Sequence, residues 1–138
     1  MTAPTTRPFA VAATEAPVEA WGPEPLVTWR THTSADRTDS NDLTTGVCTI
    51  APGGELGRHH HAQPEVYHYL SGTGRMQVND EYFDVVAGTT VFVPGHAWHH
   101  TVNVGDEDLR LFYCFAADSF ADIRYHYPDG SEWQATGQ

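Results

Sequence analysis

Two short histidine-rich stretches hold the residues best suited to chemistry. The first, residues 53–65, contains His59, His61 and Glu65. Alternate side chains of an extended chain point to the same face, so we expect His59 and His61 to project together and His60 to project away. Imidazole and carboxylate groups are ordinary ligands of Fe, Mn, Ni, Zn and Cu. This stretch therefore predicts most of a mononuclear metal site.

A further ligand has to come from another part of the chain, and the second stretch offers three candidates. They are His96, His99 and His100, which follow Pro94 and Gly95. Six of the nine histidines fall in the two stretches, and each stretch adjoins glycine and proline residues at a strand boundary, where sites are usually built. The alternative is a cluster of surface histidines with no ligand role, and the density of the two stretches argues against it.

The elements that must position these residues are predicted to be short strands. Segments rich in Val, Thr, Tyr and Phe alternate with turn residues such as Asn79-Asp80 and Ala87-Gly88. They span residues 26–31, 43–51, 65–71, 73–79, 81–86, 89–93, 98–104, 109–116 and 123–127. Short strands at this spacing are typical of an all-β sandwich or barrel.

Length and composition limit the possible architecture and partners. A chain of 138 residues suits one domain. Residues 1–25, with prolines at 4, 8, 17, 23 and 25, are predicted to be an extended or partly disordered arm, and residues 26–138 the folded domain. Seven basic and 18 acidic residues give a formal charge of -11, which argues against a nucleic-acid partner.

Two further patterns concern the cellular compartment. Cys48 and Cys114 form neither a CxxC pair nor a disulfide framework, which fits a reducing compartment. The sequence has no signal-peptide pattern and no apolar run near the ~18 residues of a membrane span. We therefore expect a cytoplasmic protein with no membrane partner.

The two histidine-rich stretches resemble the two motifs of the cupin superfamily. The first reads Gly53-x5-His59-x-His61-x3-Glu65-x6-Gly72, and the second reads Gly88-x5-Pro94-x-His96-x2-His99-x3-Asn103. The first matches at every defining position, whereas His96 stands where the family usually has glycine. The resemblance implies an all-β, single-domain cupin-type β-barrel, which is a double-stranded β-helix similar to a jelly roll.

The resemblance also implies one divalent transition-metal ion per chain. Its ligands would be His59, His61, Glu65 and His99. Four protein ligands of this kind suit Fe, Mn, Ni or Zn, so the sequence leaves the metal open. His100, like His60, is one residue away from a ligand position and should point the other way.

A finer resemblance links the chain to the cupin-type dimethylsulfoniopropionate lyases. It rests on the pattern His-x-His-x3-Glu-x-Tyr, which ends at Tyr67, and on the aromatic tail of residues 112–127. These lyases carry a catalytic tyrosine two residues after the glutamate ligand, which makes Tyr67 the candidate base. A phenol close to a divalent cation ionises more easily. The alternative for Tyr67 is a packing aromatic with its hydroxyl bonded to a neighbour.

Other residues are candidates for a substrate pocket. Aromatic rings can hold a cationic substrate group by cation–π contact, although such rings are more often part of the core. The candidates are Tyr69, His96, Trp98 and Tyr113.

These observations favour a metal-dependent enzyme acting on a small metabolite. The first hypothesis is a lyase in which Tyr67 removes a proton and a β-leaving group departs, giving an unsaturated acid and a sulfide. The second is an Fe(II)-dependent dioxygenase, and the third is an isomerase or a non-catalytic small-molecule-binding cupin. We also expect a homodimer, with the arm of residues 1–25 and the strand 109–116 as candidate contacts.

Overall fold

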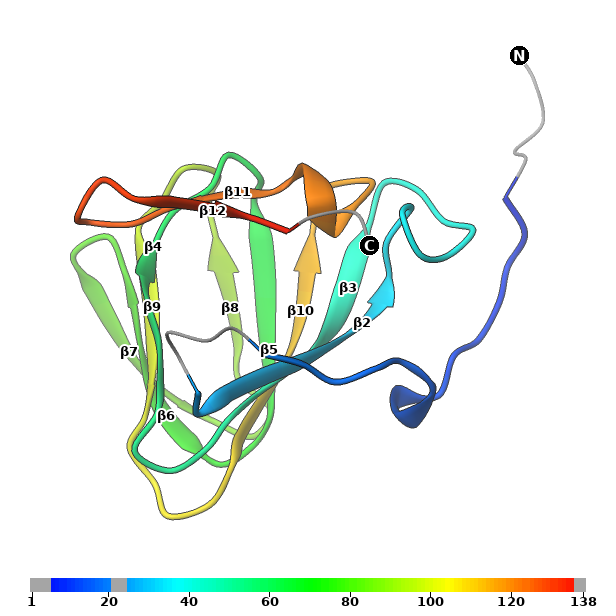
Figure 1. Ribbon diagram of the computed structural model, residues 1–138. Helices are drawn as coiled ribbons and strands as arrows, with labels where there is room; N and C mark the ends of the chain where they lie inside the picture. The colour runs from blue at the N-terminus through cyan, green and yellow to red at the C-terminus, as the bar shows by residue number, and fades with distance from the viewer. Residues whose placement is uncertain (1–5, 21–24, 136–138) are drawn as a thin grey trace.

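The computed structural model describes residues 6–20 and 25–135 and is built almost wholly of strands (Figure 1). The strands are β1 (Glu19–Ala20), β2 (Val27–Thr33), β3 (Thr44–Ile50), β4 (Glu55–His59), β5 (Glu65–Ser71), β6 (Thr73–Val78), β7 (Glu81–Val86), β8 (Thr90–Val93), β9 (His99–Asn103), β10 (Leu109–Phe115), β11 (Arg124–His126) and β12 (Glu132–Gln134). Single turns of 3₁₀ helix occur at η1 (Ala13–Glu15) and η2 (Phe120–Asp122). The all-β prediction is confirmed.

Two sheets face each other around the core. One has the strand order β1-β2-β3-β10-β5-β8, and the other has the order β4-β9-β6-β7. Among the described residues no strand pairing joins the two sheets, so the predicted barrel is a jelly-roll-like pair of sheets rather than one closed ladder. The β11–β12 hairpin forms a small third sheet, which lies across one end of the two larger ones (Figure 1).

Strand β10 shows how the sequence produces this packing. Its alternate residues Leu109, Leu111, Tyr113 and Phe115 are each at most 5% exposed and face the core, because successive side chains of a strand point to opposite faces. The residues between them face outward. Since β10 lies between β3 and β5, both of its edges are paired, and it carries the central ladder of the larger sheet.

The predicted strand segments match the observed strands to within a few residues, and three strands were not predicted. β4 coincides with the first histidine motif, which was predicted to be extended but was not included among the strand segments. β12 is only three residues long. β1 lies inside the predicted arm, where Glu19 and Ala20 pair with Trp29 and Thr28 and so join the end of the arm to the sheet. The remainder of the predicted arm at 1–5 and 21–24 lies outside the described residues.

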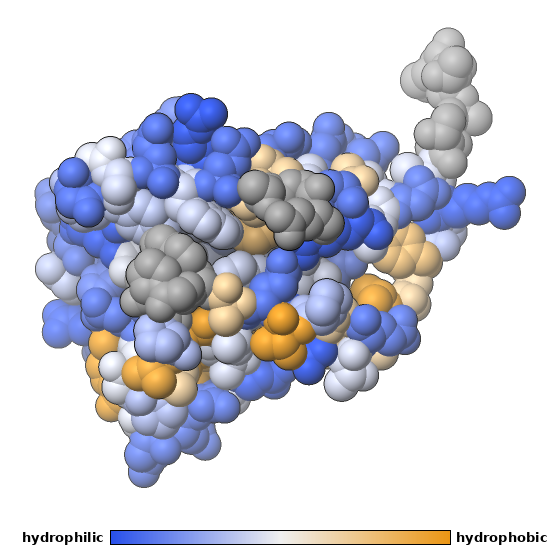
Figure 2. Space-filling model, viewed as in Figure 1, coloured by the Kyte–Doolittle hydropathy of each residue, from blue (hydrophilic) through white to orange (hydrophobic). Residues whose placement is uncertain are grey.

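One face of the molecule is mostly polar. Hydrophilic residues cover most of the face shown in Figure 2, and the hydrophobic ones form small separate groups. None of the helical segments in the described ranges has the length and apolar character needed to cross a membrane.

Candidate metal centre

Three histidines meet at the inner face of the smaller sheet. His59 ends β4, His61 follows two residues later, and His99 begins β9; each side chain is 1% exposed. β4 and β9 run antiparallel, which places His59 directly opposite His99 with 4.1 Å between ring centroids. One ligating atom from each of the three imidazoles lies within 4.8 Å of the others. The expectation that His59 and His61 share a face agrees with this placement.

Glu65 approaches the same point from the larger sheet. It is the first residue of β5 and is 2% exposed. Its Oε1 lies 3.1 Å from His61 Nε2 and 3.3 Å from His99 Nε2. The structure therefore brings together all four predicted ligand side chains: His59 and His99 from the smaller sheet, His61 from the loop after β4, and Glu65 from the larger sheet.

Backbone contacts fix the orientation of each imidazole. Every Nδ1 lies against the carbonyl oxygen of a residue two positions away in the chain. The distances are 2.6 Å for His59 with Gly57, 2.9 Å for His61 with Gln63 and 2.9 Å for His99 with Ala97. Because a carbonyl only accepts, each Nδ1 carries the proton and each Nε2 keeps a free lone pair directed at the site. This tautomer leaves each Nε2 able to bind a metal ion.

The buried nitrogens of this site fit a cation better than they fit the protein alone. His99 Nε2 is fully buried and has no hydrogen-bond partner among the described residues. An unsatisfied buried polar atom costs about 1–3 kcal/mol, and a bound metal ion would satisfy it. Burial, and next the neighbouring His99, hold the pKa of His59 well below its usual value, which favours the neutral imidazole that binds metal.

The two histidines next to the ligand positions point away from the site. His60 stacks on His126 of β11 with 4.8 Å between ring centroids, and the backbones of these two residues form an isolated β-bridge. His100 Nε2 lies 3.2 Å from the carboxylate of Glu55 at the surface. Strand alternation explains both placements.

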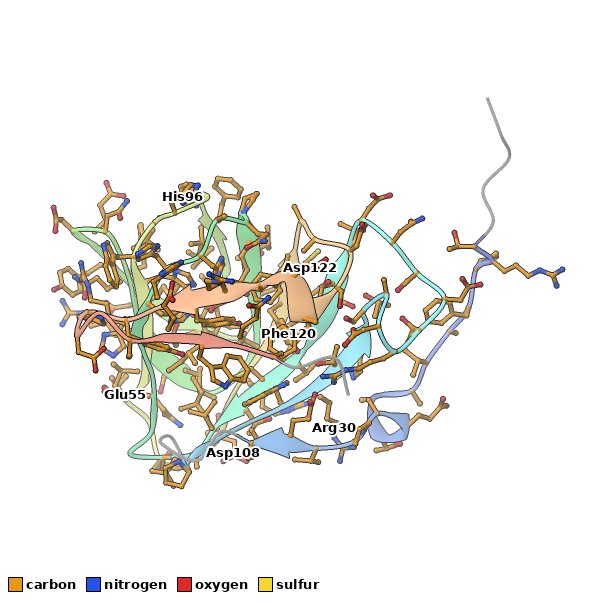
Figure 3. All side chains as sticks on the ribbon, turned by 45° about the horizontal axis from the view of Figure 1, so that its top comes forward. Arg30, Glu55, His96, Asp108, Phe120 and Asp122 are labelled. Carbon is orange, nitrogen blue, oxygen red and sulfur yellow. The ribbon has the colours of Figure 1, made fainter. Side chains whose placement is uncertain are left out.

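His96, which replaces the usual glycine, adopts the backbone conformation that favours glycine. Its φ angle is 66°, in the left-handed region. Its N–H donates to the carbonyl oxygen of His61 at 2.7 Å, which links the second motif to the first. The side chain itself is exposed at the rim of the molecule (Figure 3) and is not part of the cavity wall. The contribution of His96 is therefore a backbone contact.

A cavity between the sheets reaches the candidate metal centre. Both His59 and Glu65 lie on its wall. Most of the remaining wall is aromatic. Its aromatic residues include Trp29, Tyr67, Tyr113, Tyr125, Tyr127 and Trp133.

Tyr67 lies on this wall beside the histidines. It is 2% exposed, and its ring centroid is 5.9 Å from that of His99. Burial, and next the Glu65 carboxylate, raise the pKa of the Tyr67 phenol well above its usual value. Tyr67 therefore stays protonated unless a positive charge is bound nearby.

The other expected pocket residues have different positions. Tyr113 lines the cavity. Tyr69 is 0% exposed and its hydroxyl lies 3.1 Å from Thr101 Oγ1, so it belongs to the core. Trp98 packs against His60, and neither Tyr69 nor Trp98 is part of the cavity wall.

Several rings that close the cavity were not predicted from the sequence. Tyr125 stacks on His59 with 5.0 Å between ring centroids and lies 5.4 Å from His61. The ring centroid of Trp133 on β12 lies 5.4 Å from that of Tyr125, so the β11–β12 hairpin covers the candidate metal centre with aromatic side chains. The alternation of Tyr125 and Tyr127 in the tail was the available signal. Trp29 gave none, because its partners lie far away in the sequence.

Comparisons with known proteins agree with this geometry. The dimethylsulfoniopropionate lyase DddW of Ruegeria pomeroyi is 34% identical over 123 residues, which cover 87% of this chain and 80% of that protein. A glucose-6-phosphate isomerase of Sinorhizobium medicae is 33% identical over 98 residues, but these are 60% of this chain and 45% of the isomerase.

Solved structures show the same fold at low sequence identity. A predicted oxalate decarboxylase of Thermotoga maritima superposes with a TM-score of 0.70 at 22% identity, covering 79% of this chain and 99% of that one. An RmlC-like cupin of Shewanella frigidimarina gives 0.69 at 18% identity, covering 84% and 96%. Residues 46–115, which run from β3 through the four predicted ligands to the end of β10, match the cupin domain family. The chain belongs to the cupin family.

Proposed function

We propose that this cupin is a metal-dependent lyase that removes a proton from a small carboxylic acid and releases a β-leaving group. The observation that carries the proposal is the position of Tyr67 on the wall of the cavity beside His99, in the arrangement expected of a base next to a metal centre. The similarity to the dimethylsulfoniopropionate lyase DddW over most of both chains supports this reaction class.

The cavity wall suits a substrate with a cationic group. Dimethylsulfoniopropionate carries a sulfonium cation at one end and a carboxylate at the other. The faces of Trp29, Tyr125 and Trp133 attract such a cation, because aromatic rings have negative faces. The part of the wall that the structure describes contains no arginine, and the chain has no lysine, so the metal centre is the place for the carboxylate. A divalent cation there would act as a Lewis acid on that carboxylate and make the neighbouring C–H more acidic.

The residues of the chain have distinct roles in this proposal. His59, His61, Glu65 and His99 would hold the ion, which would supply the positive charge that binds the substrate carboxylate. The Tyr67 phenolate takes the proton from the carbon next to the carboxylate. The electrons of the C–H bond form the new C=C bond, and the sulfide leaves with the electron pair of the C–S bond. The products are an unsaturated acid and a neutral sulfide.

The β11–β12 hairpin keeps bulk water away from this step. Tyr125 covers His59, and Trp133 packs behind Tyr125. Excluding water strengthens the electrostatic interactions inside the cavity and protects the proton transfer. The hairpin is therefore part of the proposed active site as well as of the fold.

The isomerase relatives favour a second candidate, because an isomerase needs the same metal and base. A sugar phosphate requires a group that binds phosphate, and the described wall offers no arginine for it, which favours the lyase. The deciding experiment assays metal-loaded protein with dimethylsulfoniopropionate and, separately, with a sugar phosphate, each with and without oxygen. Sulfide release supports the lyase, and turnover only with oxygen supports a dioxygenase. Binding without turnover supports a non-catalytic cupin, and turnover of a sugar phosphate alone supports the isomerase.

A further inference from the structure

A row of residues crosses the larger sheet from the cavity to the predicted arm. On four consecutive strands, Thr31, Gly46, Tyr113 and Tyr67 lie directly opposite one another. Gly46 leaves room for the Tyr113 ring, because a Cβ there would collide with the Tyr113 hydroxyl and with the carbonyl of Arg30. The Tyr113 ring therefore passes over β3, and its hydroxyl reaches Thr31 on β2.

Hydrogen bonds continue this row to the surface. The Tyr113 hydroxyl lies 3.4 Å from Thr31 Oγ1, and Thr31 Oγ1 donates to Glu19 Oε2 at 3.2 Å. Arg37 Nη1 lies 2.6 Å from the same carboxylate oxygen. The 3.4 Å contact between Tyr113 and Thr31 is the longest and weakest of these links.

The chemistry of these groups makes all the hydrogen bonds between Tyr113, Thr31 and Glu19 run in one direction, from donor to acceptor toward Glu19. A carboxylate only accepts, so the single hydroxyl proton of Thr31 is directed at Glu19. Thr31 can then only accept from Tyr113, whose proton points away from the cavity. The free lone pairs of the Tyr113 oxygen are left on the cavity side.

The two ends of this hydrogen-bond chain, Tyr113 and Glu19, differ in their exposure to solvent. Tyr113 and Thr31 are 5% and 6% exposed, whereas the Glu19 side chain is 26% exposed. Tyr113 begins the chain on the cavity wall, next to the candidate base Tyr67 on the neighbouring strand. This hydrogen-bond chain thus connects the wall of the proposed active site to solvent by a route separate from the cavity mouth.

We propose that Tyr113, Thr31 and Glu19 form a proton path out of the cavity. The Tyr113 oxygen accepts a proton from the cavity side as its own proton moves to Thr31, and the Thr31 proton moves to Glu19, which releases it to solvent. No oxidation state changes, and rotation of the two hydroxyls restores the starting arrangement. The path rests on the proposed function, because elimination from a sulfonium carboxylate leaves one proton in the cavity at each turnover.

Tyr69 provides an internal control. Its hydroxyl lies 3.1 Å from Thr101 Oγ1, which donates to the Met76 sulfur at 2.8 Å. Burial raises the phenol pKa of both Tyr69 and Tyr113 well above the usual value. The Tyr69 chain ends at a buried thioether, whereas the Tyr113 chain ends at an exposed carboxylate. Only the second chain can pass a proton to solvent.

Hydroxyl exchange on carbon-labelled tyrosine, followed by NMR, tests the path without substrate or turnover. In the wild-type protein the Tyr113 hydroxyl should exchange with solvent deuterium at least about tenfold faster than that of Tyr69. Thr31→Val and Glu19→Gln should slow Tyr113 to about the Tyr69 rate and leave Tyr69 unchanged. Thr31→Ser keeps the hydroxyl and should keep the fast exchange.

Two results would overturn the proposal. Equal exchange of Tyr113 and Tyr69 in the wild type excludes the path, and this comparison needs no variant to fold. Fast Tyr113 exchange that neither Thr31→Val nor Glu19→Gln slows means that the proton leaves through the cavity mouth. Neither exchange measurement depends on catalysis, so both can still be interpreted if the lyase assay fails. With an active lyase, Thr31→Val should lower kcat at unchanged KM, and Thr31→Ser should not.

Discussion

Glu65 and His99 begin strands in opposite sheets, yet 3.3 Å separates Glu65 Oε1 from His99 Nε2. The same carboxylate oxygen is 3.1 Å from His61 Nε2. These contacts place the candidate metal centre at the junction of the two sheets, where one ion would link both. Metal binding should therefore stabilise the fold as well as support chemistry.

The first prediction concerns the ligands. His59→Ala and His99→Ala should each lose most of the bound metal, because each removes a buried imidazole whose Nε2 faces the site. Metal analysis after purification without added metal measures this, with circular dichroism to check that the strands persist. His60→Ala is the matched control, since His60 points away toward His126, and it should keep its metal. Full metal occupancy in both variants would contradict the assignment of His59 and His99 as metal ligands.

The second prediction concerns Tyr67. Tyr67→Phe removes one oxygen, so the fold and the metal content should persist. If Tyr67 is the base, turnover should fall by about 10²- to 10⁴-fold, mainly in kcat. A residue that only packs would affect stability slightly and activity little, so a near-normal kcat in this variant would exclude the base role.

The third prediction concerns the aromatic wall. Trp133→Leu keeps an apolar side chain but removes a ring face that attracts cations. Affinity for a cationic onium inhibitor should fall by about 2- to 30-fold, the equivalent of ~0.5–2 kcal/mol. A neutral inhibitor of the same shape serves as control and should lose much less. Equal losses for the two inhibitors would show that Trp133 acts only by packing.

The fourth prediction concerns association. We expect a homodimer, and β10 cannot form it by edge pairing because both of its edges are occupied. The outer face of the larger sheet remains available, and Phe92 on β8 is 64% exposed there. Light scattering at micromolar concentration should give a mass of two chains, and Phe92→Glu should reduce it to one. A wild-type mass of one chain would rule the dimer out.

The features that the sequence predicted are those encoded by local pattern. The alternation of His59, His60 and His61 gave the inward and outward directions of the three rings, because strand geometry alone decides them. The strand segments followed from Val, Thr, Tyr and Phe between turn residues. His96 shows the limit of a motif: its departure from glycine left the turn geometry open, and the structure shows a left-handed backbone at that position.

What the sequence could not predict depends on contacts between distant segments. Tyr125 lies close to His59 because the β11–β12 hairpin folds back across the end of the two sheets, where β4 ends. Trp29 reaches the same cavity from β2, and Glu19 reaches Thr31 through a strand of two residues. Such short or distant pairings carry too little local signal to be identified from sequence.

The most direct test of the lyase assignment is an anaerobic assay of sulfide release from dimethylsulfoniopropionate by the metal-loaded protein. We expect release of dimethyl sulfide and an unsaturated acid in equal amounts without oxygen, loss of activity on chelation, and recovery when the metal is restored. Metal-loaded protein that binds the compound and releases no sulfide, or that releases it only with oxygen present, would contradict the assignment.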